Sequence, residues 1–280
     1  MHRGRSRFLN IMLFFGFTFL YVPIILLIIY SFNYSKLVPV WGGWSTRWYG
    51  VLFESPEVWD AVLLSLKIAV VNATFATLFG TLAGLGMVRF GRFKGRTLFG
   101  GMLVAPLVMP EVITGLSLLV FFISLKQLFG WPTERGFTTI TIAHITFSLA
   151  YVAVIIQARL TGMGNNLEEA AADLGAKPFK VLTKITIPML VPGLLSGWLL
   201  AFTLSLDDLV IASFVTGPGS NTLPILIFSR IRLGLRPDIN ALATIIILFV
   251  ALLVAIAAII LFKQQKRDLL DQKMARMPEV

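Results

Sequence analysis

The sequence predicts an all-α polytopic membrane protein with six transmembrane helices in a single domain over residues 1–280. Two properties of the composition point to this class. Hydrophobic residues make up 57% of the chain and charged residues only 14%, and the mean hydropathy is +0.85. Soluble domains have fewer hydrophobic and more charged residues than this. The third observation is a set of six apolar stretches, each long enough for a hydrocarbon core that needs roughly 20 residues.

The predicted spans follow one another along the chain with short polar connections. They cover about residues 9–31, 62–88, 97–123, 138–158, 189–214 and 240–262. The N-terminal segment, the second and fourth loops and the tail hold 16 Lys and Arg residues, whereas the alternate loops hold seven. Because Lys and Arg are enriched in cytoplasmic loops, we expect both termini and the fourth loop on the cytoplasmic side. The first span is too long for a signal-peptide core and is expected to remain as an anchor.

The formal net charge of +10 does not predict a nucleic-acid partner. Most of the cations flank the cytoplasmic ends of the spans, where anionic membrane lipid and the topology account for them. The chain has no cysteine, which excludes disulfides and thiol chemistry. It also lacks the G-x-x-x-x-G-K-[ST] pattern of a phosphate-binding loop. We therefore expect no ATP site and no cofactor in this chain.

The first outer loop, residues 32–60, is aromatic. It contains Trp41, Trp44, Trp48, Tyr49 and Trp59. Anchoring at the membrane interface explains these residues, because Trp prefers the headgroup level. Contact with a periplasmic partner is the alternative.

The second span combines a charged residue with small ones. Lys67 lies near its outer end, where the side chain can extend to the interface. Gly80, Gly84 and Gly86 lie in the inner half. Small residues four apart let a neighbouring helix approach closely, so we expect tight packing there, against a partner permease or another span.

The third span contains Pro106 and Pro110, four residues apart. Each removes a backbone hydrogen bond, so the helix should be bent or broken just before Glu111. A carboxylate within a span is costly and usually faces a cavity or a partner charge. In the fourth span, His144 has no second ligand near it, and no site is assigned to it.

The fourth loop, residues 159–188, predicts a helical hairpin. Asn165 or Asn166 can cap a short helix, Glu168 and Glu169 lie in its first turn, and Gly175 ends it. Pro178 then favours the start of a second short helix, and Pro188 marks the start of the fifth span. Such a hairpin is either a solvated connection or a docking element.

The fifth span contains two consecutive acids, Asp207 and Asp208, toward its outer side. Neighbouring residues on a regular helix point about 100° apart, so only one can line a path. The structural interpretation is an ion pair with Lys67 or an outer Arg. The functional interpretation is an acidic cluster of Asp207, Asp208 and Glu111 that receives a cation.

The spacing within the fourth loop resembles a known motif. Glu169-Ala170-Ala171, three residues, Gly175, nine residues, and Ile185-x-Ile187-Pro188 resemble the EAA motif of ABC-importer permeases, with Ile187 replacing the usual Leu. The resemblance implies the MetI-like fold of type I importers, with residues 159–188 as a coupling loop docked on a cytoplasmic ATPase that binds ATP and Mg. The implied coupling residues are Glu168, Glu169, Ala170, Ala171, Gly175 and Pro188.

Longer strings narrow the resemblance. FGFTFLYVPIILLIIYSFN, GWSTRWYG, APLVMPEVITGLSLL and SGWLLAFTLSLDDLVIASFVTGPG are similar to the polyamine ABC-importer permeases, and most closely to the second permease subunit of the putrescine importer. The resemblance implies a multi-pass subunit of the bacterial inner membrane, paired with a second permease, two ATPases and a periplasmic binding protein for putrescine or spermidine. Asp207, Asp208 and Glu111 would then line the substrate path.

Three other functions fit less well. A permease for another solute, such as an oxyanion, differs only in its cargo, and the intramembrane acids argue against an anion. A stand-alone carrier often shows an internal repeat, and we find none. An intramembrane aspartyl protease needs two Asp residues on separate helices, whereas Asp207 and Asp208 are consecutive.

Overall fold

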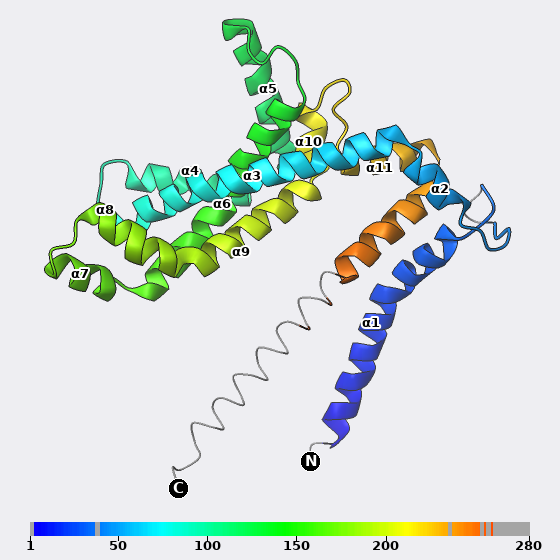
Figure 1. Ribbon diagram of the computed structural model, residues 1–280, viewed down its shortest axis with the longest axis horizontal. Coiled ribbons are helices and arrows are strands. Elements are labelled where there is room, and N and C mark those ends of the chain that lie inside the picture. Colours follow the sequence, from blue (N-terminus) through cyan, green and yellow to red (C-terminus); the bar gives the residue numbers. More distant parts are fainter. Residues whose placement is uncertain (1–2, 37–39, 235–236, 253–254, 256–258, 260–280) are drawn as a thin grey trace. The chain divides into compact units, whose positions relative to one another are not determined.

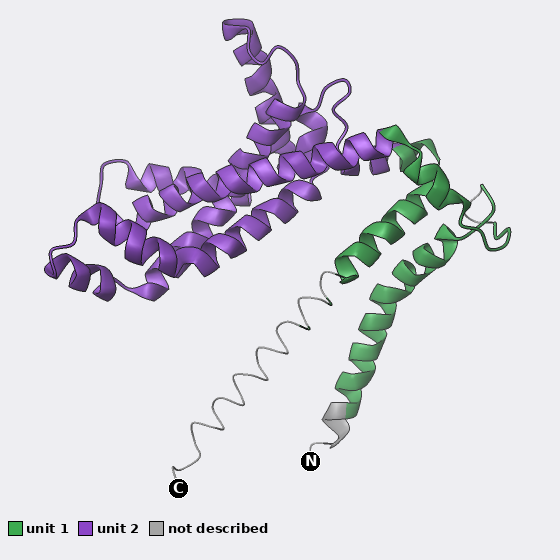
Figure 2. Ribbon diagram, in the orientation of Figure 1, with its two compact units in different colours: residues 1–56, 230–280 green, residues 57–229 purple. Residues whose placement is uncertain are grey.

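The computed structural model describes residues 3–36, 40–234, 237–252, 255 and 259. Helices dominate the described residues, which confirms the all-α prediction. The chain divides into two compact units, one formed by residues 1–56 and 230–280 and the other by residues 57–229 (Figure 2). The cytoplasmic position of the termini stays a prediction, because residues 1–2 and 260–280 lie outside the described part. The assignment of residues 1–280 to one domain also stays a prediction.

Within the described residues, five helices are long and apolar enough to cross a membrane. They are Arg7–Ser31, Pro56–Arg89, Glu111–Phe129, Phe137–Met163 and Pro178–Leu206. A shorter apolar helix, Pro237–Leu252, covers the first part of the predicted sixth span, 240–262. The remainder of that span lies almost entirely outside the described residues. The helices are consistent with the six-span prediction.

The first unit contains α1 (Arg3–Ser31), α2 (Arg47–Phe53) and the helix Pro237–Leu252. The aromatic outer loop folds around Asn33, whose backbone oxygen accepts a hydrogen bond from Trp48 Nε1 at 2.7 Å. Trp48 is buried, whereas Trp44 is 72% exposed. Trp48 is therefore a packing residue of this loop, and interfacial anchoring does not explain it.

The second unit holds the helices that position the candidate sites (Figure 1). In chain order they are α3 (Pro56–Arg89), α4 (Arg96–Val108), α5 (Glu111–Phe129), α6 (Phe137–Met163), α7 (Asn166–Asp173), α8 (Pro178–Val181), a π-helical turn (Leu182–Thr186), α9 (Ile187–Leu206), α10 (Val210–Val215) and most of α11 (Leu223–Leu233). Among the candidate spans, α6 is the most buried, because 61% of its most apolar stretch is buried. α3, α4, α5, α9 and α10 contact it.

Two glycines of α3 allow this packing. A Cβ on Gly80 would lie 2.7 Å from Val152 Cβ, and one on Gly84 would lie 2.8 Å from Ile156 Cγ2, both on α6. A Cβ on Gly86 would meet nothing within 4 Å. The predicted close approach is thus confirmed at Gly80 and Gly84, and the neighbour is another span of the same chain. Packing at Gly86 against a partner permease stays a prediction.

The predicted third span, 97–123, is two helices. The first, α4, ends at Val108, Met109 and Pro110 are extended with ψ of 137° and 135°, and α5 begins at Glu111. Proline lacks an N–H and restricts the residue before it to extended conformations, which explains the break. The predicted interruption before Glu111 is confirmed. The prediction of one span over residues 97–123 was wrong, because α5 turns away from α4 (Figure 1).

The predicted fifth span, 189–214, has different ends. Helical structure is continuous from Pro178 through the π turn to Leu206. The short helix predicted to begin at Pro178 is therefore the first part of the helix that forms the fifth span. The i→i+5 spacing of a π turn gives Pro188 room where it has no N–H to donate. The helix then stops at Asp207 and resumes as α10 at Val210. Asp207 and Asp208 therefore lie in a break between two helices. The 100° separation of neighbours on a regular helix does not fix the directions of their side chains.

Candidate functional site

The fourth loop forms the predicted hairpin at one end of the second unit (Figure 1). Gly175 follows α7 with φ of +80°, a conformation that favours glycine. Pro178 occupies the first position of α8, as expected. Asn165 holds the N-cap position, but its side chain makes no cap hydrogen bond. It accepts a hydrogen bond from the guanidinium of Arg89 instead.

Arg89, the last residue of α3, fixes the hairpin to the second span. Its Nε lies 2.9 Å from Glu168 Oε2, and its Nη2 donates to the Gly164 oxygen at 2.7 Å. The other Glu168 oxygen accepts a hydrogen bond from Thr186 Oγ1 at 2.7 Å. Glu168 is therefore held inside the chain and orients the hairpin. Sequence reasoning counted Arg89 only as a topology charge and missed this role.

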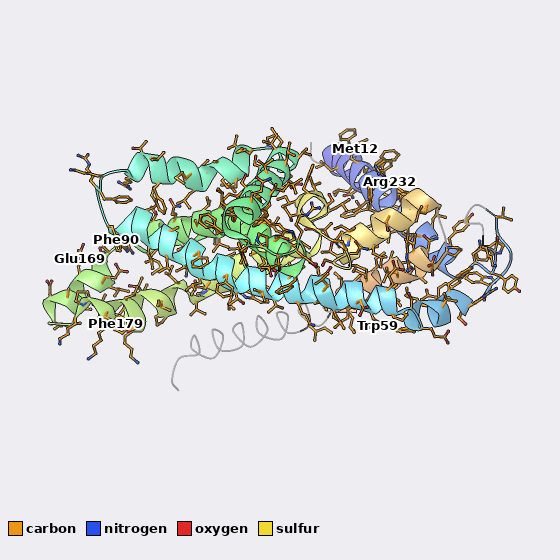
Figure 3. All side chains as sticks on the ribbon, turned by 90° about the horizontal axis from the view of Figure 1, so that it is seen from above. Met12, Trp59, Phe90, Glu169, Phe179 and Arg232 are labelled. Atoms are coloured by element: carbon orange, nitrogen blue, oxygen red, sulfur yellow. The ribbon has the colours of Figure 1, made fainter. Side chains whose placement is uncertain are left out.

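The outer face of the hairpin is exposed and partly apolar. No residue of α7 is buried, and Glu169 and Ala170 are exposed while Ala171 is half-buried. Leu174 is 90% exposed and Phe179 76%. Glu169 and Phe179 both lie at this end of the unit (Figure 3). The exposed acid and the large exposed apolar side chains make this hairpin a candidate docking surface.

The break in the fifth span is held by Asp208. Its Oδ2 accepts a hydrogen bond from the Ala212 N–H at 2.7 Å, and its Oδ1 accepts one from the Ile211 N–H at 3.3 Å. Oδ2 also lies 3.0 Å from His144 Nε2. The other ring nitrogen of His144, Nδ1, lies 2.7 Å from Ser205 Oγ. The two side chains of the ion pair are 3% and 10% exposed.

The side-chain partner of Asp208 differs from the one that the sequence suggested. Lys67 is exposed and lines a cavity of about 530 Å³ together with Glu57, Asp60 and Asn221. His144 takes the place expected for Lys67 or an outer Arg. One His in a span gave no signal by itself. Its spacing to Ser148, four residues on, could have indicated a buried polar face on α6.

Asp207 and Glu111 are both exposed. Asp207 ends α9, with its backbone N–H donating to the Thr203 oxygen at 3.2 Å. Glu111 is the first residue of α5. Within the part of the chain that the structure describes, neither carboxylate has a side-chain partner.

α5 packs closely on α10. A Cβ on Gly115 of α5 would be 3.3 Å from the Ile211 Cα of α10. Arg135, in the loop before α6, donates a hydrogen bond to the Phe214 oxygen near the end of α10 at 3.4 Å. Glu111 lies one turn before Gly115 on α5, and its place beside the two Asp residues stays a prediction.

A buried polar contact links the middle of α3 to α9 and α6. Asn72, near the middle of the 34-residue α3, donates from Nδ2 to the Ala201 oxygen at 2.8 Å and to Ser148 Oγ at 3.2 Å. Asp207 lies six residues beyond Ala201, or roughly 9 Å at 1.5 Å per residue.

Comparisons with known proteins indicate the family of the chain. Residues 76–269 match the family described as binding-protein-dependent transport system inner membrane component. The chain is 55% identical over 272 residues to the putrescine transport system permease protein PotI of Escherichia coli strain K12, with 97% of each covered. It is 40% identical over 257 residues to the spermidine/putrescine transport system permease protein PotC of the same strain, covering 92% of this chain and 95% of that protein.

Two solved structures support the fold alone. One is a bacterial ABC transporter involved in the import of the acidic polysaccharide alginate, with a TM-score of 0.72 at 15% identity over 92% of this chain and 96% of that chain. The other is the MetNI methionine ABC transporter, with a TM-score of 0.59 at 15% identity over 79% of this chain and 98% of that chain. The predicted permease fold is confirmed.

Proposed function

This chain belongs to the binding-protein-dependent transport system inner membrane component family, and on that premise we propose that it imports polyamines. It would be the permease subunit of an ATP-driven importer whose cargo is putrescine or spermidine. The observation that carries the proposal is the 55% identity to a putrescine permease over 97% of both chains. The similarity thus includes both candidate sites and is not confined to a common core.

The chemistry of the acids fits such a cargo. A polyamine carries two or more ammonium groups, and each loses hydration when it leaves water. Carboxylates replace that hydration better than neutral groups do. Asp207, Asp208 and Glu111 are the acids that we place in the substrate path. Affinity in this path should be weak, because a tight site would not release its cargo, and we therefore assign selectivity to the binding protein.

The exposed hairpin supplies the coupling to ATP. We propose that Glu169, Ala170 and Ala171 dock into a groove of an ATPase subunit, with Gly175 providing the bend and Pro188 the start of the rigid helix behind it. Arg89 and Glu168 hold the hairpin to the span, so a movement of the ATPase is transmitted to α3 and α9. ATP and Mg bind to the ATPase subunits, and this chain supplies no cofactor site.

The complete transporter would contain this permease, a second permease, two ATPases and a periplasmic polyamine-binding protein, in the inner membrane of a bacterium. The chain with an affinity tag can be purified from its native membranes in mild detergent and its partners identified. Cells that lack other polyamine transporters and express the identified set should accumulate labelled putrescine. Excess spermidine should compete, and an oxyanion such as sulfate should not.

This experiment separates the alternatives. If the same set of proteins took up an unrelated solute and no polyamine, the proposed cargo would be wrong, but the proposed role as an importer subunit would stand. Uptake by this chain alone, without an ATPase, would support a stand-alone carrier and contradict the proposal.

A further inference from the structure

We propose that the two consecutive acids of the fifth span have different roles. Asp207 meets the cationic cargo, and Asp208 is an anchor that His144 withdraws from the path. The inference rests on the proposed function for the identity of the cargo. The division of roles rests on the hydrogen bonds and exposure of the two side chains.

The carboxylate of Asp208 is already occupied by three groups of the same chain. It accepts hydrogen bonds from the Ile211 and Ala212 amides of α10 at 3.3 and 2.7 Å, and Oδ2 lies 3.0 Å from His144 Nε2. If Asp208 turned to bind an ammonium group, two amides and an imidazole would lose their acceptor. Leaving buried donors without partners is costly, so Asp208 is a poor cargo ligand.

The protons of this cluster can be assigned from its partners. A carboxylate only accepts, so Nε2 of His144 carries the proton and donates it to Asp208. The other ring nitrogen, Nδ1, lies 2.7 Å from the Ser205 hydroxyl. The ring is 3% exposed. The contacts of His144 with Ser205 and Asp208 thus join the end of α9 to the start of α10.

Asp207 has the opposite properties. It is exposed, and among the described residues its carboxylate has no hydrogen bond or ion pair. An ionised carboxylate facing hydrocarbon is costly, and we therefore infer that Asp207 faces the second permease or water. Glu111 is also exposed and is the other acid that we place in the path.

His144 is accordingly a positioning residue. It does not touch the cargo, and it acts by holding Asp208 so that the preceding residue is the one presented. If His144 were only a packing residue, its loss would change stability without changing which acid is accessible. The two roles therefore predict different outcomes in an accessibility measurement.

The absence of cysteine makes that measurement direct, because each introduced thiol is the only one in this subunit. Asp207→Cys, Asp208→Cys and a buried control, Ala201→Cys, are compared in the assembled transporter with a cationic methanethiosulfonate reagent. Ala201 is fully buried on α9. We expect the thiol at position 207 to react at least tenfold faster than the other two.

The same reagent tests the role of His144. In the His144→Ala background, with the complex intact by size-exclusion chromatography, the thiol at position 207 should react at least threefold more slowly, and His144→Gln, which keeps a donor, should restore its rate. Reaction at position 208 as fast as at 207, or no reaction at 207, would overturn the inference. An unchanged rate at position 207 in the His144→Ala complex would remove the positioning role from His144. If the wild-type complex does not import polyamines, the proposed function has failed instead.

Discussion

His144 Nε2 lies 3.0 Å from Asp208 Oδ2 and joins α6 to the point where the fifth span is interrupted. The interruption follows directly from this contact and the two amide hydrogen bonds that Asp208 accepts, because α10 begins with its N-terminal amides already bonded to a carboxylate. Such a cap favours starting a new helix over continuing the old one. The break in turn leaves Asp207 exposed at the end of α9.

Replacing Asp208 by Ala should destabilise the permease by at least about 2 kcal/mol, because two α10 amides and the His144 ring lose their acceptor. Asp207→Ala is the matched control, and it should change stability by less than about 0.5 kcal/mol, as expected for a side chain without partners. The melting temperatures of the two detergent-purified complexes measure the difference. Equal melting temperatures would show that Asp208 does not hold the break.

Replacing Gly80 by Ala should disturb the packing of α3 on α6. The new Cβ would lie 2.7 Å from Val152 Cβ and 2.9 Å from the Leu149 backbone oxygen, and overpacking of this kind costs about 1 to 3 kcal/mol. Gly86→Ala adds the same methyl group to the same helix, in open space. Alanine favours a helix over glycine by up to about 1 kcal/mol. Gly86→Ala should therefore leave the melting temperature unchanged or raise it.

Arg89→Ala should separate ATP hydrolysis from transport. The hairpin would lose its contacts to Glu168, Asn165 and Gly164, so movement of the ATPase would no longer be passed to α3. Arg92→Ala removes an exposed cation from the following loop and serves as the control. We expect the ratio of cargo imported to ATP hydrolysed to fall at least fivefold for Arg89→Ala only. A normal ratio would mean that the hairpin needs no anchor on α3.

Glu169→Lys should weaken binding of the ATPase subunits. The hairpin surface combines this acid with the exposed Leu174 and Phe179, and a reversed charge at a docked position opposes association. Glu134→Lys, at an exposed position on the predicted outer side, is the control. The amount of ATPase that copurifies with the tagged permease should fall at least tenfold for Glu169→Lys. Unaltered copurification and uptake would remove the coupling role from Glu169.

The local features of the fold could be predicted from the sequence, because they depend on residues close together in the chain. Pro106 and Pro110 predict the break before Glu111, and Gly175 and Pro178 predict the hairpin turn. Gly80 and Gly84 indicate a close helix contact. These signals work because a missing N–H, a positive φ or a missing Cβ acts on the immediate surroundings.

Contacts between distant parts of the chain could not be predicted in this way. Glu168 looks as available to a partner as Glu169, until Arg89 and Thr186 are found beside it. Asp207 and Asp208 look equivalent, until His144 reaches one of them from α6. The helix period distinguishes the faces of a regular helix, but here the polar network itself ends the helix. The choice between the two acids therefore depends on tertiary structure.

The most direct test of the account is uptake of labelled putrescine into proteoliposomes that contain the purified complete transporter, with loaded binding protein on one side and ATP on the other. The account predicts accumulation that requires both ATP and the binding protein and that falls at least tenfold with Asp207→Asn. Accumulation without ATP, or no accumulation of any polyamine by a complex that hydrolyses ATP, would contradict it.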